Sequence, residues 1–167
     1  MTLFNGLKIE TIIADGDLDG LIAASILKTY FSEAKTIFAH AAEIRNGNLD
    51  KMIDRNTAIC DLPFHPNCGL YLDHHSTNKP SEKELEYFIS SGGEFEWYSV
   101  DSAARVAYDL CSKEIDLSHL EQFMEMVDKL DSGKITLSEF NSENPIMWLS
   151  KTINLDDLDY VYLLLEW

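Results

Sequence analysis

The sequence has little of what disulfide-rich, membrane-spanning or secreted proteins require. It contains three cysteines, an odd number without CxxC spacing, so it offers neither a disulfide framework nor a zinc ribbon. No apolar run approaches the roughly 20 residues that span a bilayer. The first residues lack a cationic stretch followed by the long apolar stretch typical of a signal peptide. We therefore expect a protein of the reduced cytoplasm.

Positive charge is also scarce. The chain has 13 Lys and Arg against 29 Asp and Glu, which gives a formal net charge of −16. Binding to duplex nucleic acid depends on many Lys and Arg contacts to phosphate, and anionic membranes attract basic segments. The charge balance therefore argues against both partners. An anionic substrate would need cations bound at its site to offset the local field.

Hydrophobic residues make up 46% of the 167 residues, enough for a core in one compact domain. Strand-like and helical patterns alternate over about 1–112, and helical patterns continue over about 113–167. The predicted strands are 8–14, 36–39, 57–60, 69–72 and 94–98. The predicted helices cover 21 to about 30, 48–55, 81–90, 102–110, a stretch after 118 and parts of 145–167. This order predicts an α/β fold with a mostly parallel five-stranded sheet, helices on both faces and a helical C-terminal portion.

Two capping-box patterns mark predicted helix starts. Ser81 and Glu84 form one, and Ser118 and Glu121 form the other. In each, the serine caps the first turn while the glutamate reaches back to the serine N–H. Both patterns predict a helix that begins just after the serine.

Acidic residues follow several of the predicted strands. The run Asp15-Gly-Asp17-Leu-Asp19-Gly follows the first strand, Asp61 follows the third, and Asp73-His-His follows the fourth. Ligands of parallel sheets bind beyond the carboxyl ends of the strands, so these side chains are expected to converge. Carboxylates with imidazoles suit Mn²⁺ or Mg²⁺ better than a thiolate metal. A solvated acidic turn with surface histidines is the simpler alternative, but crowding carboxylates without a cation is costly.

The motifs, taken in order, resemble those of the DHH phosphoesterase family. The resemblance rests on Asp15-Gly-Asp17-Leu-Asp19-Gly20 with Ala24-Ser25, on Asp61, on Asp73-His74-His75, on Ser102-Ala103-Ala104 and on Val127-Asp128-Lys129-Leu130-Asp131-Ser132-Gly133. No single motif is decisive, but their order and their strand-end positions are specific together. The resemblance implies one DHH-type domain over 1–167.

It also implies a hydrolase with two Mn²⁺ or Mg²⁺ ions. The implied metal ligands are Asp15, Asp17, Asp19, Asp61, His74 and Asp131, with Asp128 as the alternative to Asp131. Asp73 would orient a histidine, and His75 would donate to the phosphate or act as the acid for the leaving group. Ser102 and Arg105 are the expected substrate contacts, since backbone amides at a helix start can hold an anion; a surface salt bridge is the alternative for Arg105.

The chain departs from the family pattern in two places. Many members carry a histidine four residues before the middle aspartate of the first motif; Ile13 stands there, so Asp15 would have to serve instead. Nothing after Gly133 resembles the glycine-rich, basic motif of the family's second, substrate-binding domain. We therefore expect either a catalytic-domain fragment or a reduced member, and the apolar run at 163–167 favours a truncation or a partner surface.

The expected function is hydrolysis of a small anionic phosphate substrate by a water that two metals activate. The substrate would be a phosphodiester or phosphoanhydride of a small nucleotide or short oligonucleotide. Alternatives are a non-catalytic metal- or nucleotide-binding domain, a polyphosphatase or pyrophosphatase, and an EF-hand-like calcium module. Residues 15–20 and 128–139 suggest the last, but Ile26 stands where the first loop needs a bidentate acid.

Overall fold

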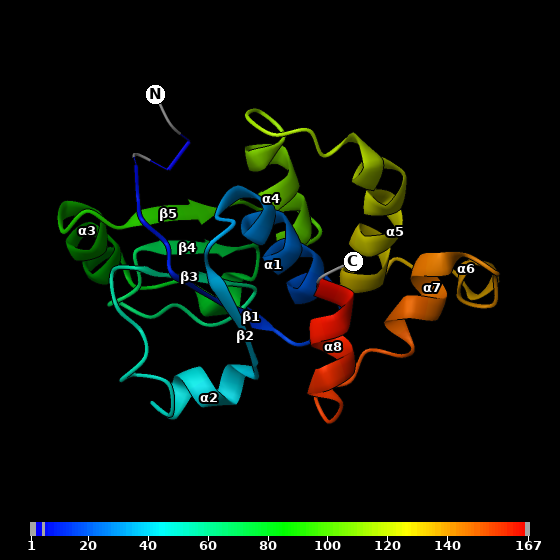
Figure 1. Cartoon of the computed structure of the whole chain (residues 1–167), viewed down its shortest axis with the longest axis horizontal. Helices are drawn as coiled ribbons and strands as arrows, with labels where there is room; N and C mark the ends of the chain where they lie inside the picture. The colour runs from blue at the N-terminus through cyan, green and yellow to red at the C-terminus, as the bar shows by residue number, and fades with distance from the viewer. Residues whose placement is uncertain (1–2, 5, 166–167) are drawn as a thin grey trace.

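The computed structural model describes residues 3–4 and 6–165 (Figure 1). Its sheet has five strands in the order β2-β1-β3-β4-β5, and all neighbouring pairs are parallel. The strands are β1 (Thr11–Asp15), β2 (Lys35–Ala39), β3 (Thr57–Cys60), β4 (Leu70–Asp73) and β5 (Glu94–Trp97). The α-helices are α1 (Leu18–Tyr30), α2 (Ala41–Arg45), α3 (Glu82–Ser90), α4 (Ala103–Cys111), α5 (Glu121–Asp131), α6 (Leu137–Phe140), α7 (Pro145–Ser150) and α8 (Leu158–Leu165). Two 3₁₀ turns are η1 (Ser76–Asn78) and η2 (Ser118–Leu120). The predicted α/β fold is confirmed.

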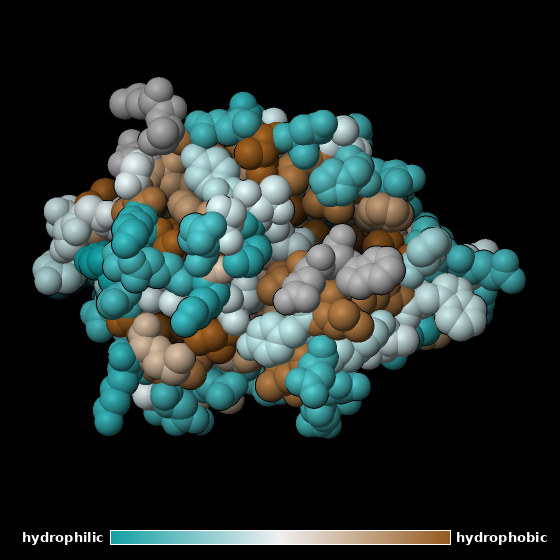
Figure 2. Space-filling view, viewed as in Figure 1, coloured by the Kyte–Doolittle hydropathy of each residue, from teal (hydrophilic) through white to brown (hydrophobic). Residues whose placement is uncertain are grey.

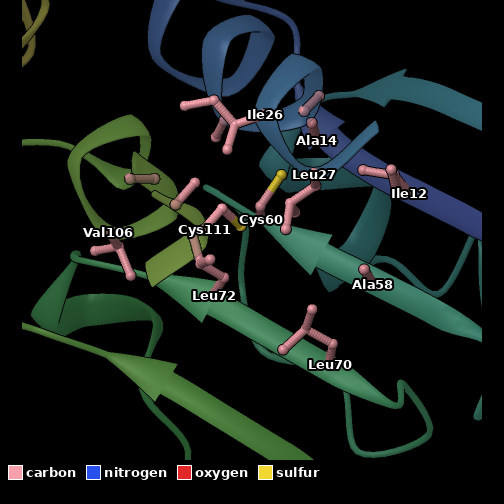
Figure 3. Close-up of a cluster of buried hydrophobic side chains, with 14 of the residues drawn as sticks. Ile12, Ala14, Ile26, Leu27, Ala58, Cys60, Leu70, Leu72, Val106 and Cys111 are labelled. Atoms are coloured by element: carbon pink, nitrogen blue, oxygen red, sulfur yellow. The ribbon is translucent and has the colours of Figure 1, made fainter. Parts of the chain in front are cut away.

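Helices cover both faces of the sheet because successive strand residues point to opposite sides. Ile12 packs on one face with α1 and α4, where Ile26 and Val106 meet the strands (Figure 3). Its neighbour Ile13 packs on the other face, in one cluster with Ile44 of α2 and Phe88 of α3. The central strands β1, β3 and β4 are buried on both faces and read as nearly continuous apolar runs, and this made them visible in the sequence.

The strand order reverses between β1 and β3. β1 pairs with β2 on one side and with β3 on the other, and Ala14 lies opposite Cys60. In sheets of this order the crossovers leave the switch point in opposite directions, and a crevice opens beyond the strand ends. Asp15 and Asp61 follow Ala14 and Cys60 directly, so both acids stand at the edge of this crevice.

The C-terminal helices pack beside α1 and α4 instead of continuing the sheet (Figure 1). α5 contacts both α1 and α4 through a small separate core that includes Leu18, Ala104 and Val127, and α8 contacts α1. Figure 2 shows hydrophobic side chains at the surface around α8, where Leu163 is 53% exposed. Of the apolar run at 163–167, the last two residues lie outside the described ones.

One predicted helix and one predicted capping box were wrong. Residues 48–55 form turns, and the helix of this connection is α2, at 41–45. The Glu43 side chain accepts the His40 N–H at its start, and Gly47 follows it with φ +71°. The second capping box does not form: the Asp116 side chain takes the Ser118 N–H, η2 intervenes, and α5 begins without a side-chain cap. The first capping box is confirmed at Ser81.

No helix within 3–4 and 6–165 combines the length and the apolar character needed to cross a bilayer.

Candidate functional site

The turn between β1 and α1 presents two carboxylates at the edge of the sheet. Asp15 accepts the Gly16 N–H at 2.7 Å, and Asp17 caps α1 by accepting the Gly20 N–H at 3.0 Å. Gly20 is required because a Cβ there would lie 2.2 Å from the Asp15 carbonyl oxygen. The first turn of α1 therefore sits directly against the end of β1. The Asp17 side chain is accessible to solvent, but many protein atoms surround its carboxylate. The resulting desolvation raises its pKa.

Asp19 is buried, and the start of α4 holds its carboxylate. Its two oxygens accept the N–H groups of Ala103 and Ala104, each at 2.7 Å. These amides belong to the first helical turn, which has unpaired donors and favours negative charge. Burial and the charge of Asp131 nevertheless raise the pKa of Asp19 to about 8.

Asp61 has a left-handed backbone conformation, with φ +58°. Aspartate tolerates this conformation better than most residues. Its N–H still bonds the Leu72 carbonyl at 3.1 Å, so the chain stays tied to β4. Such strained positions gather at functional sites. Burial, followed by the charge of Asp19, raises the pKa of the Asp61 carboxyl well above its ordinary range.

Asp73 is fully buried and accepts hydrogen bonds from several donors. One oxygen receives the Tyr71 hydroxyl at 2.7 Å and the Asn78 amide at 2.9 Å. The other receives the His74 and His75 backbone N–H groups at 2.7 and 3.2 Å. With both oxygens engaged, Asp73 fixes the conformation of the turn that carries the two histidines.

His74 has one ring nitrogen tied to the backbone and the other facing acids. Nδ1 lies 3.2 Å from the Val100 carbonyl oxygen, which can only accept, so Nδ1 donates. Nε2 lies 3.1 Å from Asp131, 3.6 Å from Asp19 and 3.9 Å from Asp61. Nε2 and Asp61 Oδ1 are buried side-chain atoms with no hydrogen-bond partner assigned among the described residues.

Three acidic side chains around one ring nitrogen repel one another, and its lone pair, unless protons or a metal cation lie between them. Burial by itself lowers the pKa of His74, but Asp131 and Asp19 outweigh it and raise the pKa to about 9. In the protein without metal, a proton therefore takes this position near neutral pH. Metal-binding histidines commonly donate their second nitrogen to a backbone carbonyl, as His74 does.

His75 is the more exposed histidine, with 43% of its side chain accessible. Its Nδ1 lies 3.1 Å from Asp73 Oδ1 and 3.4 Å from Asp61 Oδ1. Because a carboxylate only accepts, the Asp73 contact places a proton on Nδ1 and leaves Nε2 free to face a bound molecule.

Among the residues that the structure describes, two groups of side chains could each hold a metal ion, and His74 belongs to both. The groups are Asp61, Asp73, His74 and His75, and Asp19, His74 and Asp131. Asp17, Asp19 and Asp131 also line a pocket of about 230 Å³. Asp15 and Asp17 belong to neither group, although both stand at the same edge; burial and then Asp17 raise the pKa of Asp15 to about 6.

Asp128, Ser102 and Arg105 form a clamp between α4 and α5. The Ser102 hydroxyl donates to Asp128 at 2.7 Å, and the Arg105 guanidinium donates to it at 2.7 and 3.0 Å. Ser102 also caps α4. The structure thus places Asp128 outside the cluster and Asp131 inside it. The predicted substrate contacts of Ser102 and Arg105 remain predictions, since both side chains are engaged in this clamp.

Sequence reasoning missed Tyr71, Asn78 and Val100. None carries a motif signal, because Tyr71 and Asn78 act through Asp73 and Val100 contributes only its carbonyl oxygen. The proximity of Tyr71 and Asn78 to the Asp73 motif was the available hint.

No protein-family model matches the chain, and neither does any curated protein. Among solved structures, the chain is similar to the pGpG-specific phosphodiesterase PggH from Vibrio cholerae. The TM-score is 0.73 at 22% identity, and the match covers 93% of this chain and 51% of that one. The chain thus spans about half the length of the solved protein. At this identity the similarity shows a shared fold.

Proposed function

We propose that this domain is a DHH-type phosphodiesterase that hydrolyses a small nucleotide or short oligonucleotide with two divalent cations, Mn²⁺ or Mg²⁺. The observation that carries the proposal is the convergence of three acidic side chains on His74 Nε2, with Asp131 at 3.1 Å, Asp19 at 3.6 Å and Asp61 at 3.9 Å. The similarity to a phosphodiesterase fold supports the class of reaction. The proposal includes that the protein acts in the reduced cytoplasm.

The donor set fits the proposed metals. The cluster supplies carboxylate oxygens and imidazole nitrogens, and the three cysteines are buried. Hard divalent cations prefer such oxygen-rich sites. Asp61, His74, Asp19 and Asp131 would be ligands, with Asp17 and Asp15 added at the mouth. When bound, the cations would activate a water and neutralise a phosphoryl oxygen.

The chain's own residues would position the reaction. Asp73 holds the Nδ1 proton of His75, so Nε2 is the atom that meets the substrate. A protonated Nε2 would donate to the phosphate or supply the leaving oxygen with its proton. The left-handed backbone at Asp61 and the amides that hold Asp19 fix both carboxylates before substrate arrives, and this lowers the entropic cost of alignment.

Two observations favour a small nucleotide. The acidic chain repels long nucleic acids except where cations are bound. PggH is named as specific for pGpG, a dinucleotide, and the shared fold makes a substrate of that size the first to test.

The test is hydrolysis of an aryl phosphodiester and of dinucleotides by purified protein, with and without Mn²⁺. We expect turnover only with the metal and two Mn²⁺ sites by titration calorimetry. Tight Mn²⁺ binding without turnover would support the non-catalytic domain. Micromolar Ca²⁺ binding with a rearrangement of helices would support the EF-hand alternative, although Asp128 pairs with Arg105 and Glu139 pairs with Lys129.

A further inference from the structure

The turn that carries Asp15 and Asp17 is held in a different way from the neighbouring acid Asp19. Amides of α4 fix the Asp19 carboxylate from outside its own turn. In the part of the chain that the structure describes, the hydrogen bonds to the Asp15 and Asp17 carboxylates come from backbone amides of residues 16–20. These bonds shape the turn locally, so its position against the rest of the site depends on packing.

Leu155 supplies this packing at Gly16, between the two acids. Gly16 is buried and does not have a positive φ, so its backbone conformation does not demand glycine. A Cβ at this position would lie 1.9, 2.2 and 2.7 Å from Leu155 Cδ2, Cγ and Cδ1. Because Cγ overlaps as well as both methyl groups, rotation of the methyl groups alone would not clear the space. Glycine therefore lets Leu155 lie directly on the backbone between the two carboxylates.

The loop that carries Leu155 is anchored on both sides. It joins α7 to α8, and Figure 1 shows α8 beside the start of α1, which it contacts. The Asn154 side chain accepts the Asp156 N–H at 3.0 Å, and the Asn154 carbonyl accepts the Asp157 N–H at 2.9 Å. Val161 of α8 is buried in the main core, and the half-buried Leu155 packs against the same core. The loop thus presents Leu155 to the turn from a fixed base.

The same segment borders the metal cluster at a second point. Ser150, at the end of α7, lines the cavity of about 230 Å³ together with Asp17, Asp19 and Asp131. Residues 150–155 therefore form one wall of the site, although no motif in the sequence marks them.

We propose that Leu155 is a positioning residue of the metal centre: by packing on Gly16, it holds the turn of Asp15 and Asp17 where both carboxylates reach the cations. Leu155 acts through these acids. Carboxylates that are already held in place lose less conformational entropy when they bind a cation, so loss of the contact weakens metal binding. The inference deepens the proposed function and rests on it for the presence of the two cations.

Titration calorimetry with Mn²⁺ on the full chain measures this role. Leu155→Ala should weaken Mn²⁺ binding about tenfold, the lower end of the range for residues that support metal ligands. Leu164→Ala is the matched control, because Leu164 is also a half-buried leucine that packs against the main core, but from α8. In thermal unfolding with EDTA both variants should lose stability, whereas Leu164→Ala should bind Mn²⁺ as the parent does.

Steric complementarity between the two positions gives a second test. Gly16→Ala should weaken Mn²⁺ binding about tenfold or more, because the new methyl group displaces either Leu155 or the turn. In the Gly16→Ala/Leu155→Ala double variant, the smaller side chain at 155 leaves room for this methyl group. The double variant should therefore bind Mn²⁺ about as tightly as Leu155→Ala alone, whereas independent effects would multiply to about 100-fold. Multiplied losses would overturn the proposal.

Conservative variants keep the test decisive even where Leu155→Ala does not fold. Leu155→Met retains the side-chain volume and should bind Mn²⁺ within about threefold of the parent, and the shorter Leu155→Val should bind it more weakly than Leu155→Met. If the parent binds Mn²⁺ and the shortened variants bind it equally well, this inference alone fails, and Leu155 is an ordinary core residue. If the parent binds no Mn²⁺, the proposed metal centre fails, and the role of Leu155 fails with it.

Discussion

The sheet edge and helix α5 bring residues to one cluster by different means. Asp61 and His74 are seated by the backbones of adjacent parallel strands and by the buried carboxylate of Asp73. Asp131 comes from a helix outside the sheet, and α5 is tied to α4 by the contacts of Asp128 with Ser102 and Arg105. One part of the site is therefore fixed by strand register, and the other by side-chain contacts of α5, namely the apolar core around Val127 and the polar contacts of Asp128.

The largest loss of activity is expected at Asp61, the acid at the end of β3. Asp61→Asn should reduce Mn²⁺-dependent hydrolysis by at least about 1,000-fold, a barrier increase of about 4 kcal/mol. Asparagine also accepts the left-handed backbone, so the change isolates the carboxylate charge. The measurement is kcat/KM on an aryl diester, with Asp159→Asn, an exposed acid in α8, as the control. Turnover at the parent rate would end the case for a metal centre at this edge.

The second effect is on the metal-free protein, where crowded acids should make stability fall as pH rises. Asp19 has a pKa of about 8 when folded against an ordinary 3.8, and that of Asp61 is also raised. The folded state thus binds more protons than the unfolded chain from about pH 4 to 8, and each extra proton costs about 1.4 kcal/mol per pH unit. His74 acts in the same direction. Its raised pKa stabilises the folded state fully below pH 6.5, and this stabilisation is lost as the pH approaches 9.

Thermal unfolding with EDTA at pH 5 and pH 8 measures this trend. We expect a lower Tm at pH 8, a reversal on adding Mn²⁺, and a smaller pH dependence in Asp61→Asn. A metal-free Tm that rises between pH 5 and pH 8 would show that the acids are not crowded as described.

The two regions also differ in how much of them the sequence revealed. The strand ends were predicted because buried parallel strands leave apolar runs that stop at Asp15, Asp61 and Asp73. The choice between Asp128 and Asp131 stayed open because both stand on α5. Which of them faces His74 depends on how α5 is rotated about its own axis when it packs against α4. Hydrophobic periodicity also misplaced α2, because the cap contact between His40 and Glu43 that starts this helix leaves no apolar pattern.

The clamp offers a third test, of intermediate size. Arg105→Ala should lower Mn²⁺ affinity or kcat/KM by about 10- to 100-fold, the range for residues that support metal ligands. Asp109→Ala is the matched control, because Asp109 lies 3.7 Å from the other side of the same guanidinium and outside the clamp. If Arg105 contacted substrate instead, its loss would raise KM and leave Mn²⁺ affinity unchanged. Titration calorimetry with Mn²⁺ separates the two roles.

The smallest effect is expected at Tyr71. It tests whether the remaining hydrogen bonds to Asp73 can hold the histidine turn when one of them is lost. Tyr71→Phe removes one donor to Asp73, which keeps the Asn78 amide and the two histidine N–H groups. The change should cost about 1 kcal/mol of stability and less than about fivefold in kcat/KM, because the turn stays tied at its other contacts. Urea unfolding and steady-state kinetics measure the two effects. A collapse of activity comparable with Asp61→Asn would mean that one hydroxyl, and not strand register, holds the histidines in place.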